Sequence, residues 1–143
     1  MNSTRKDLVF KVASAIHRTL YRRTGGRIGG RLNGCPVLLL TTAGRTTGKP
    51  RTTPLLYLAD GDRLVLVASK GGDDRSPGWY RNLKANSEVK VQVGPGVRRM
   101  RAATASGAER DELWARVTKM YPPYDTYQSK TSRRIPLVIL SPV

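Results

Sequence analysis

Cysteine and histidine are nearly absent from this 143-residue chain, which contains one of each, Cys35 and His17. One cysteine excludes an internal disulfide framework and a multi-cysteine metal centre, and one histidine excludes the usual two- or three-histidine metal sites. Cys35 precedes an apolar strand, where we expect it to be buried, and has no histidine to activate it. If the chain is an enzyme, we expect its reactive atom to belong to a bound cofactor.

Acidic residues and long apolar runs are also scarce. Asp and Glu total 10 against 26 Lys and Arg. We expect the acids of two predicted turns to be solvated and to form no catalytic carboxylate pair: Asp60, Asp62, Asp73 and Asp74. No apolar run approaches the roughly 18 residues of a membrane span, and the N-terminal stretch has no apolar core typical of a signal peptide. We therefore expect a cytoplasmic protein.

The excess of basic residues gives a net charge of +16, which implies an anionic partner. Nucleic acid, an anionic membrane surface and a small polyanionic ligand all fit. Apolar residues recur at three- and four-residue steps from Leu8 to Leu20, with basic residues between them, and this predicts an amphipathic helix. Residues 4–24 could bind an anionic membrane surface, or the helix could pack its apolar face on the rest of the chain.

After a glycine-rich linker, the spacing of apolar residues changes to that of strands. The pattern predicts strands near residues 37–42, 50–59, 63–68, 89–93, 97–103 and 135–140, with helices near 77–83 and 106–120. Short turns join most of the strands, so we expect a mainly antiparallel sheet closed into a small split barrel with outer helices, an α+β fold. We divide the chain into a helical arm and linker, residues 1–34, and a barrel domain, residues 35–143.

Two predicted loops combine basic residues with glycine. The first, within TTAGRTTGKPRTTP, carries Arg45, Lys49 and Arg51, and the second, within ASKGGDDRSPGWYRNLKAN, carries Ser69 and Lys70. Free backbone N–H groups beside guanidinium groups are what a phosphate or carboxylate needs, although solvated hairpin loops have the same composition. Trp79 could cover a planar ligand there, or it could anchor the short helix in the core.

A third segment, MYPPYDTYQ, places three tyrosines at three-residue spacing, so their rings share one face of a helical turn. Tyr121, Tyr124 and Tyr127 could form a lid over a flat substrate, or they could close one end of the barrel.

These segments resemble the coenzyme F(420) (deazaflavin)-dependent nitroreductase family of actinobacteria. The resemblance runs from residue 36 to residue 140 through LLLTTAGRTTGKPRTTPLLYL, VASKGGDDRSPGWYRNLKAN, KMYPPYDTYQ and RRIPLVIL. It implies a split barrel like those that bind flavin mononucleotide, and it implies coenzyme F(420), an 8-hydroxy-5-deazaflavin with a phosphate and an oligoglutamate tail, as cofactor. The implied activity is transfer of a hydride from the reduced coenzyme to a quinone, with nitroaromatics as incidental acceptors.

The resemblance also implies roles for individual residues. The residues that would bind the anionic tail are Arg45, Thr46, Thr47, Arg51 and Lys70. Those that would line the deazaflavin and phosphate are Thr52, Thr53, Pro54, Leu55, Leu56, Ala68, Ser69, Gly78, Trp79, Tyr80, Arg81, Asn82 and Tyr124. The acceptor would lie among Tyr57, Tyr121, Tyr124 and Tyr127, with Tyr124 or Ser69 as the catalytic hydrogen-bond donor.

Three positions depart from the family pattern. Thr46 stands where the family often has lysine, and Ser87 stands where it often has proline. Tyr57 comes one position later than the corresponding family tyrosine, which on a strand turns the ring to the opposite face. Two alternatives stay open: a nonspecific nucleic-acid-binding basic protein, and a barrel oxidoreductase that uses flavin mononucleotide.

Overall fold

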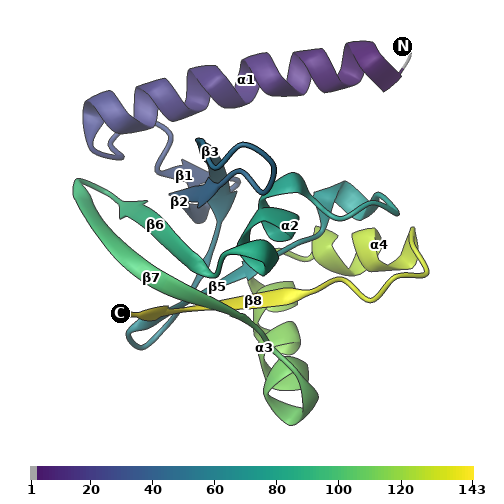
Figure 1. Cartoon of the computed structure of the whole chain (residues 1–143). Helices are drawn as coiled ribbons and strands as arrows, with labels where there is room; N and C mark the ends of the chain where they lie inside the picture. Colours follow the sequence, from purple (N-terminus) through teal and green to yellow (C-terminus); the bar gives the residue numbers. More distant parts are fainter. Residues whose placement is uncertain (1–2) are drawn as a thin grey trace.

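The computed structural model describes residues 3–143 and has an antiparallel sheet at its centre with helices around it (Figure 1). The elements are α1 Ser3–Thr24, β1 Arg31–Leu32, β2 Cys35–Ala43, β3 Pro50–Leu56, β4 Leu58–Asp60, β5 Arg63–Val67, the 3₁₀ turn η1 Lys70–Gly72, α2 Gly78–Ala85, β6 Glu88–Val93, β7 Gly96–Thr104, α3 Gly107–Met120, α4 Pro123–Ser129 and β8 Leu137–Pro142. The predicted α+β fold with a mainly antiparallel sheet is confirmed.

The sheet follows the order β1-β2-β6-β7-β8-β5-β4, and β3 pairs with β2 outside this path. The strand predicted over residues 50–59 divides at Tyr57: β3 pairs with β2, and β4 pairs with β5. The Tyr57 N–H still donates to the Pro36 carbonyl, at 3.1 Å. One strand-like sequence therefore serves two parts of the sheet.

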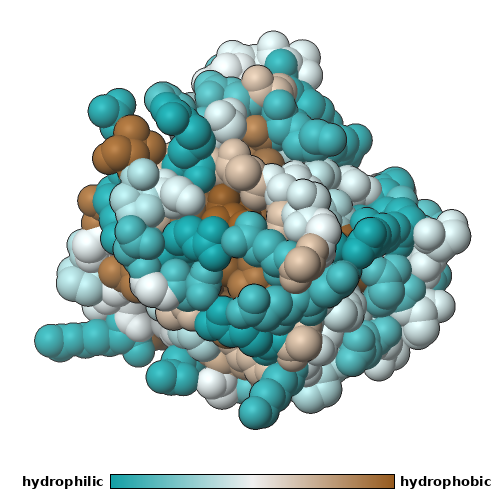
Figure 2. All heavy atoms as spheres, turned by 90° about the horizontal axis from the view of Figure 1, so that it is seen from below, coloured by the Kyte–Doolittle hydropathy of each residue, from teal (hydrophilic) through white to brown (hydrophobic). Residues whose placement is uncertain are grey.

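Alternation along the strands separates two large apolar clusters, and a third, smaller one lies around Tyr21. The curved sheet forms a half-barrel, and Leu38, Leu66 and Met100 belong to the cluster inside it. The buried residues of α2 close this half-barrel. On the other side, Val65 and Ile139 pack against α3 and α4. Seen from below, the side away from α1, apolar surface is visible between bands of hydrophilic side chains (Figure 2).

The helix α1 is held on the barrel by the buried side chain of Tyr21, which makes both apolar contacts and hydrogen bonds. Tyr21 is 1% exposed and packs against Val37 and Leu39. Its hydroxyl accepts a hydrogen bond from the Gly94 N–H (2.8 Å) and donates to the Gln92 carbonyl (3.2 Å). Burial raises the pKa of this hydroxyl.

The apolar residues of α1 stay exposed. Leu8, Val12, Ile16 and Leu20 are 61%, 52%, 57% and 42% exposed. The hypothesis that this face packs on the barrel is therefore wrong, because Tyr21 and the arginines beside it orient the helix instead.

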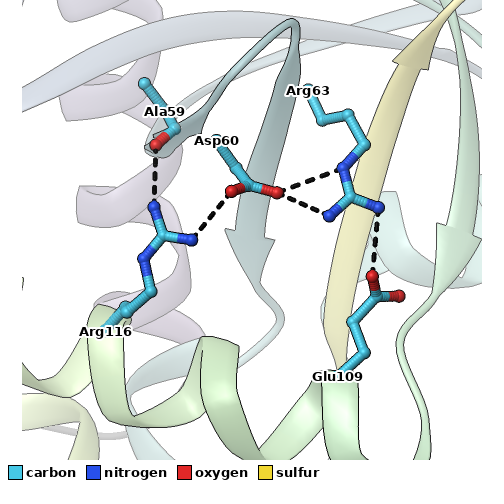
Figure 3. A network of polar contacts seen from close by, with 5 residues as sticks. All are labelled: Ala59, Asp60, Arg63, Glu109 and Arg116. Atoms are coloured by element: carbon cyan, nitrogen blue, oxygen red, sulfur yellow. Dashed lines mark hydrogen bonds and ion pairs between the residues drawn. The ribbon is translucent and has the colours of Figure 1, made fainter.

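A network of ion pairs fastens the β4–β5 hairpin to α3 (Figure 3). The Asp60 carboxylate accepts hydrogen bonds from Arg63 and from Arg116, and Arg63 also reaches Glu109 at 3.2 Å. These guanidinium groups hold the pKa of Asp60 below its usual value. The expectation that Asp60 is merely solvated is wrong: Arg63 pairs with it across the turn, and Arg116 on α3, 56 residues away in sequence, adds a second contact.

Candidate functional site

The loop between β2 and β3, residues 44–49, is held in shape by its own backbone. The Gly44 N–H donates to the Lys49 carbonyl at 2.8 Å, and the Gly48 N–H donates to the Gly44 carbonyl at 2.7 Å. Gly48 has φ +71°, which a side chain rarely tolerates. The side chains of this loop and of the start of β3 are exposed and available to a ligand: Arg45, Thr46, Thr47, Lys49 and Arg51.

Arg45 is bound to α2 through Asn82. The Asn82 side-chain oxygen accepts from the Arg45 backbone N–H (3.2 Å) and from its guanidinium (2.8 Å). The Asn82 amide in turn donates to the hydroxyl of buried Thr42 at 3.1 Å. Asn82 is itself 5% exposed. Two residues that sequence analysis assigned to the coenzyme site are thus in contact, although 37 positions separate them.

The second loop, residues 68–74, leaves β5 and leads through Pro77 into α2. Ala68 and Ser69 are buried, whereas the Lys70 side chain is exposed. Asp73 pairs with Arg75 at 3.1 Å, and this hydrogen-bonded guanidinium lowers the pKa of Asp73 to about 2. The first basic loop therefore contacts the helix α2 through Asn82, and the second basic loop is joined to α2 by residues 75–77 of the chain.

On α2, the aromatic residues belong to the core. Trp79 and Tyr80 are 9% and 7% exposed and lie in the cluster inside the half-barrel. The Tyr80 hydroxyl lies 3.1 Å from that of Thr104. Of the two interpretations of Trp79, the anchoring one holds. Gly78 and Arg81 are exposed on the same helix.

The candidate residues of β3 divide between two faces. Opposite partners in β2 put Thr53 and Leu55 on the side of Leu40 and Leu38, inside the barrel. Pro54 and Leu56 face the other way, and they line a hollow of about 200 Å³ beneath α1. The helix α1 also reaches Thr52, a contact that no pattern in the sequence indicated. The Thr52 carbonyl accepts a hydrogen bond from Arg18 (3.0 Å), and its hydroxyl accepts one from Arg22 (2.8 Å).

Three tyrosines on and beside α4 form one cluster. The ring centroids of Tyr121 and Tyr124 are 4.9 Å apart, and the Tyr121 and Tyr127 hydroxyls lie 3.4 Å apart. Tyr124 is 5% exposed, and burial raises the pKa of its hydroxyl far above the usual value. Tyr57 does not join them, because it packs with the cluster inside the half-barrel.

The tyrosine cluster lies against the 68–74 loop. A Cβ placed on Gly72 would come within 2.8 Å of the Tyr127 carbonyl oxygen, so the two backbones are in close contact. Ser69 and Lys70 are therefore carried next to α4. Cys35 is buried, as expected.

Within residues 3–143, no group of three or more His, Cys, Asp or Glu side chains could hold a metal ion. Among the described helices, none is long and apolar enough to cross a membrane.

Comparison with known proteins gives one consistent answer. The model of the F(420)H(2)-dependent quinone reductase family matches residues 13–142. The chain is 49% identical over 130 residues to an F(420)H(2)-dependent quinone reductase of Mycobacterium tuberculosis strain H37Rv, covering 88% of this chain and 87% of the relative.

Solved structures agree in sequence and in fold. A structure described as an F(420)-H2 dependent reductase (FDR-A) is 43% identical, with a TM-score of 0.69 over 74% of this chain and 94% of the other. A structure described as a domain-swapped dimer is 36% identical, with a TM-score of 0.72 over 96% of this chain and 99% of the other. The expected split-barrel fold and the resemblance to deazaflavin-dependent enzymes are confirmed. The chain belongs to the family of F(420)H(2)-dependent quinone reductases, enzymes whose cofactor is coenzyme F(420).

Proposed function

We propose that the chain transfers a hydride from reduced coenzyme F(420) to a quinone held next to the tyrosines of α4. The observation that carries this proposal is the convergence of three segments. The first basic loop contacts α2 through Asn82, the second basic loop leads into α2 along the chain, and the second loop also packs against Tyr127 through Gly72. An anionic group and a flat acceptor would then lie side by side.

The residues present fit the coenzyme. Its phosphate and oligoglutamate tail are anionic, and the exposed cations Arg45, Arg51 and Lys70 would hold them, with the hydroxyls of Thr46 and Thr47 as further donors. Asn82 orients Arg45 and would thereby fix one end of this set. The inward-facing residues Thr53 and Leu55 would line the ring together with Ser69, and buried Trp79 and Tyr80 would support that wall from within the core.

The reduced coenzyme supplies the hydride when bound. A tyrosine hydroxyl is protonated at neutral pH, and burial raises the pKa of Tyr124 further, so this hydroxyl can donate a hydrogen bond to a quinone oxygen but cannot serve as a base. Ser69 offers a second donor on the adjoining loop. Tyr121 and Tyr127 would border the acceptor and exclude water from it. Tyr57 packs with the cluster inside the half-barrel, so it would lie on the side of the site that holds the deazaflavin ring.

The test is stopped-flow oxidation of the reduced coenzyme with a panel of quinones, nitroaromatics and enones. We expect quinones to react fastest and nitroaromatics to react as incidental substrates. Tyr124→Phe should lower kcat/KM for quinones by roughly 10-fold, the value of one neutral hydrogen bond, with little change in coenzyme affinity. Tight binding of flavin mononucleotide with no response to the deazaflavin would contradict the proposal.

We also propose that residues 4–24 bind the surface of an anionic membrane, which would bring the site close to a lipid-soluble quinone. The support is the exposed stripe of Leu8, Val12, Ile16 and Leu20 on a helix that also carries exposed arginines. A basic helix with an apolar face lies stably in a lipid interface.

Liposome sedimentation tests this second proposal. Ile16→Glu should reduce binding to vesicles containing anionic lipid, because it places a carboxylate within the apolar stripe. Val97→Glu is the matched control, since Val97 is equally exposed (58% against 57%) but lies on β7. Equal binding of the wild type and Ile16→Glu would contradict the proposal.

A further inference from the structure

Arg133 lies just before β8, and its guanidinium spans the 68–74 loop. Its Nε donates to the Asp73 carbonyl at 2.8 Å, and its Nη2 donates to the carbonyls of Ala68 (3.1 Å) and Ser69 (2.9 Å). One side chain therefore holds both ends of the loop that carries Ser69 and Lys70. Arg133 is the first residue of the segment RRIPLVIL, but the sequence does not link it to the 68–74 loop, because it is one of 26 basic residues and its partners lie about 60 positions away.

The loop needs such a support because its backbone is unusual. Lys70, Gly71 and Gly72 follow one another with φ of +46°, +63° and +87°. This left-handed conformation is unfavourable for a residue with a side chain such as Lys70, and it persists only where the surroundings impose it. The planar guanidinium fork suits several carbonyl groups at fixed positions, which a lysine cannot match.

The segment that presents Arg133 is also fixed to α4. The Gln128 side chain donates to the Arg133 carbonyl (2.8 Å) and accepts from the Ile135 N–H (2.9 Å). The Thr131 hydroxyl donates to the Asp74 carboxylate at 2.7 Å. Through these contacts α4 and the 68–74 loop form one unit, with Arg133 between them.

The charge of Arg133 adds a second effect. Its described acceptors are carbonyl oxygens, and its Nη1 is buried without a hydrogen-bond partner among residues 3–143. Carbonyl dipoles compensate the positive charge of the guanidinium only partly. The 68–74 loop, which contacts this guanidinium, therefore favours binding of an anionic group.

We propose that Arg133 is a positioning residue for coenzyme binding: it fixes the 68–74 loop against α4 so that Ser69 and Lys70 meet the anionic coenzyme. This inference rests on the proposed function, because it takes the 68–74 loop as part of the coenzyme site.

The test compares Arg133→Lys and Arg133→Gln with Arg134→Gln. Arg134 is the matched control, since its side chain is 67% exposed and pairs only weakly with Asp111, at 3.4 Å. Two quantities are measured: amide hydrogen exchange of residues 68–74 without ligand, and the Kd of coenzyme F(420) by fluorescence titration. We expect Arg133→Gln to speed exchange in the loop and to weaken coenzyme binding roughly 10-fold or more, with Arg133→Lys between it and the wild type and Arg134→Gln unchanged.

Faster exchange together with weaker coenzyme binding, in a variant whose Tm stays near that of the wild type, supports the positioning role. Wild-type affinity in Arg133→Gln overturns it and leaves the proposed function standing. Failure of the wild type itself to bind the coenzyme overturns both.

Discussion

At the scale of single residues, Arg51 gives a direct test of the coenzyme site. It is exposed at the start of β3, beside the turn at Gly44. Arg51→Ala should raise the Kd of coenzyme F(420) about 10- to 100-fold, because a charge-assisted hydrogen bond contributes roughly 1.5–3 kcal/mol. Fluorescence titration measures this. Arg101→Ala, at an exposed arginine on β7, should have little effect, and unchanged affinity in Arg51→Ala would mean that the tail binds elsewhere.

Which residues could be predicted from the sequence depended on where their partners lie. The exposure of Arg45, Arg51 and Lys70 follows from local loop composition, which the sequence displays directly. The burial of Trp79 and the contact of Asp60 with Arg116 depend on residues far along the chain, so the sequence left the first open and did not show the second. The pairing of Asp60 with nearby Arg63 depends on the geometry of the turn, which composition does not reveal. The contacts of Arg133 could not be predicted either, because its partners lie about 60 positions away in sequence.

At the scale of elements, the contact between the 68–74 loop and α4 depends on Gly72. A Cβ there would lie 2.8 Å from the Tyr127 carbonyl oxygen, whereas a Cβ on Gly71 would meet nothing within 4 Å. Both glycines have positive φ, so both alanine variants carry the same kind of backbone strain.

Gly72→Ala should therefore lower the free energy of unfolding by roughly 1–3 kcal/mol more than Gly71→Ala does, the usual range for overpacking a close contact. Chemical denaturation of the two variants measures the difference. Equal losses would show that the loop and α4 can separate without cost.

The β4–β5 hairpin offers an element-scale prediction with a pH dependence. Because the folded-state pKa of Asp60 lies below the ordinary value of 3.8, its pairing stabilises the protein fully above that pH and is lost as the pH falls through the lower folded-state value.

Asp60→Asn should lower the Tm by roughly 2–4 °C at pH 7, as expected for partly exposed ion pairs, and by less near pH 3. Differential scanning calorimetry at both pH values measures this, with Asp62→Asn in the exposed turn as control. A difference in Tm that stays constant between the two pH values would argue against the ion-pair explanation.

The orientation of the helix α1 could not be predicted from the sequence. Its periodicity correctly predicted a helix with one apolar face, but periodicity does not say which face meets the barrel. Tyr21 decides that through contacts with the β6–β7 turn some 70 residues away, and the apolar stripe is left outside.

At the scale of the whole molecule, the +16 charge exceeds what a coenzyme site needs. On the β6–β7 ribbon, Lys90 stands directly opposite Arg99, an arrangement that costs stability in a sheet. Further exposed arginines lie on α1. The cations are thus spread over several surfaces, and those of the two basic loops are the ones that we assign to the coenzyme.

This distribution predicts that nucleic acid and coenzyme respond differently to salt. A DNA duplex would contact the dispersed cations, and release of its counterions should weaken binding by roughly 10³-fold or more between 50 and 200 mM salt if six or more phosphates are contacted. The coenzyme, held by the few cations of the two loops, should lose far less affinity. Fluorescence anisotropy of a labelled duplex and titration of the coenzyme, over the same salt series, measure the two slopes. Equal slopes would indicate that one set of cations binds both ligands, and the convergence of the two loops would then confer no selectivity for the coenzyme.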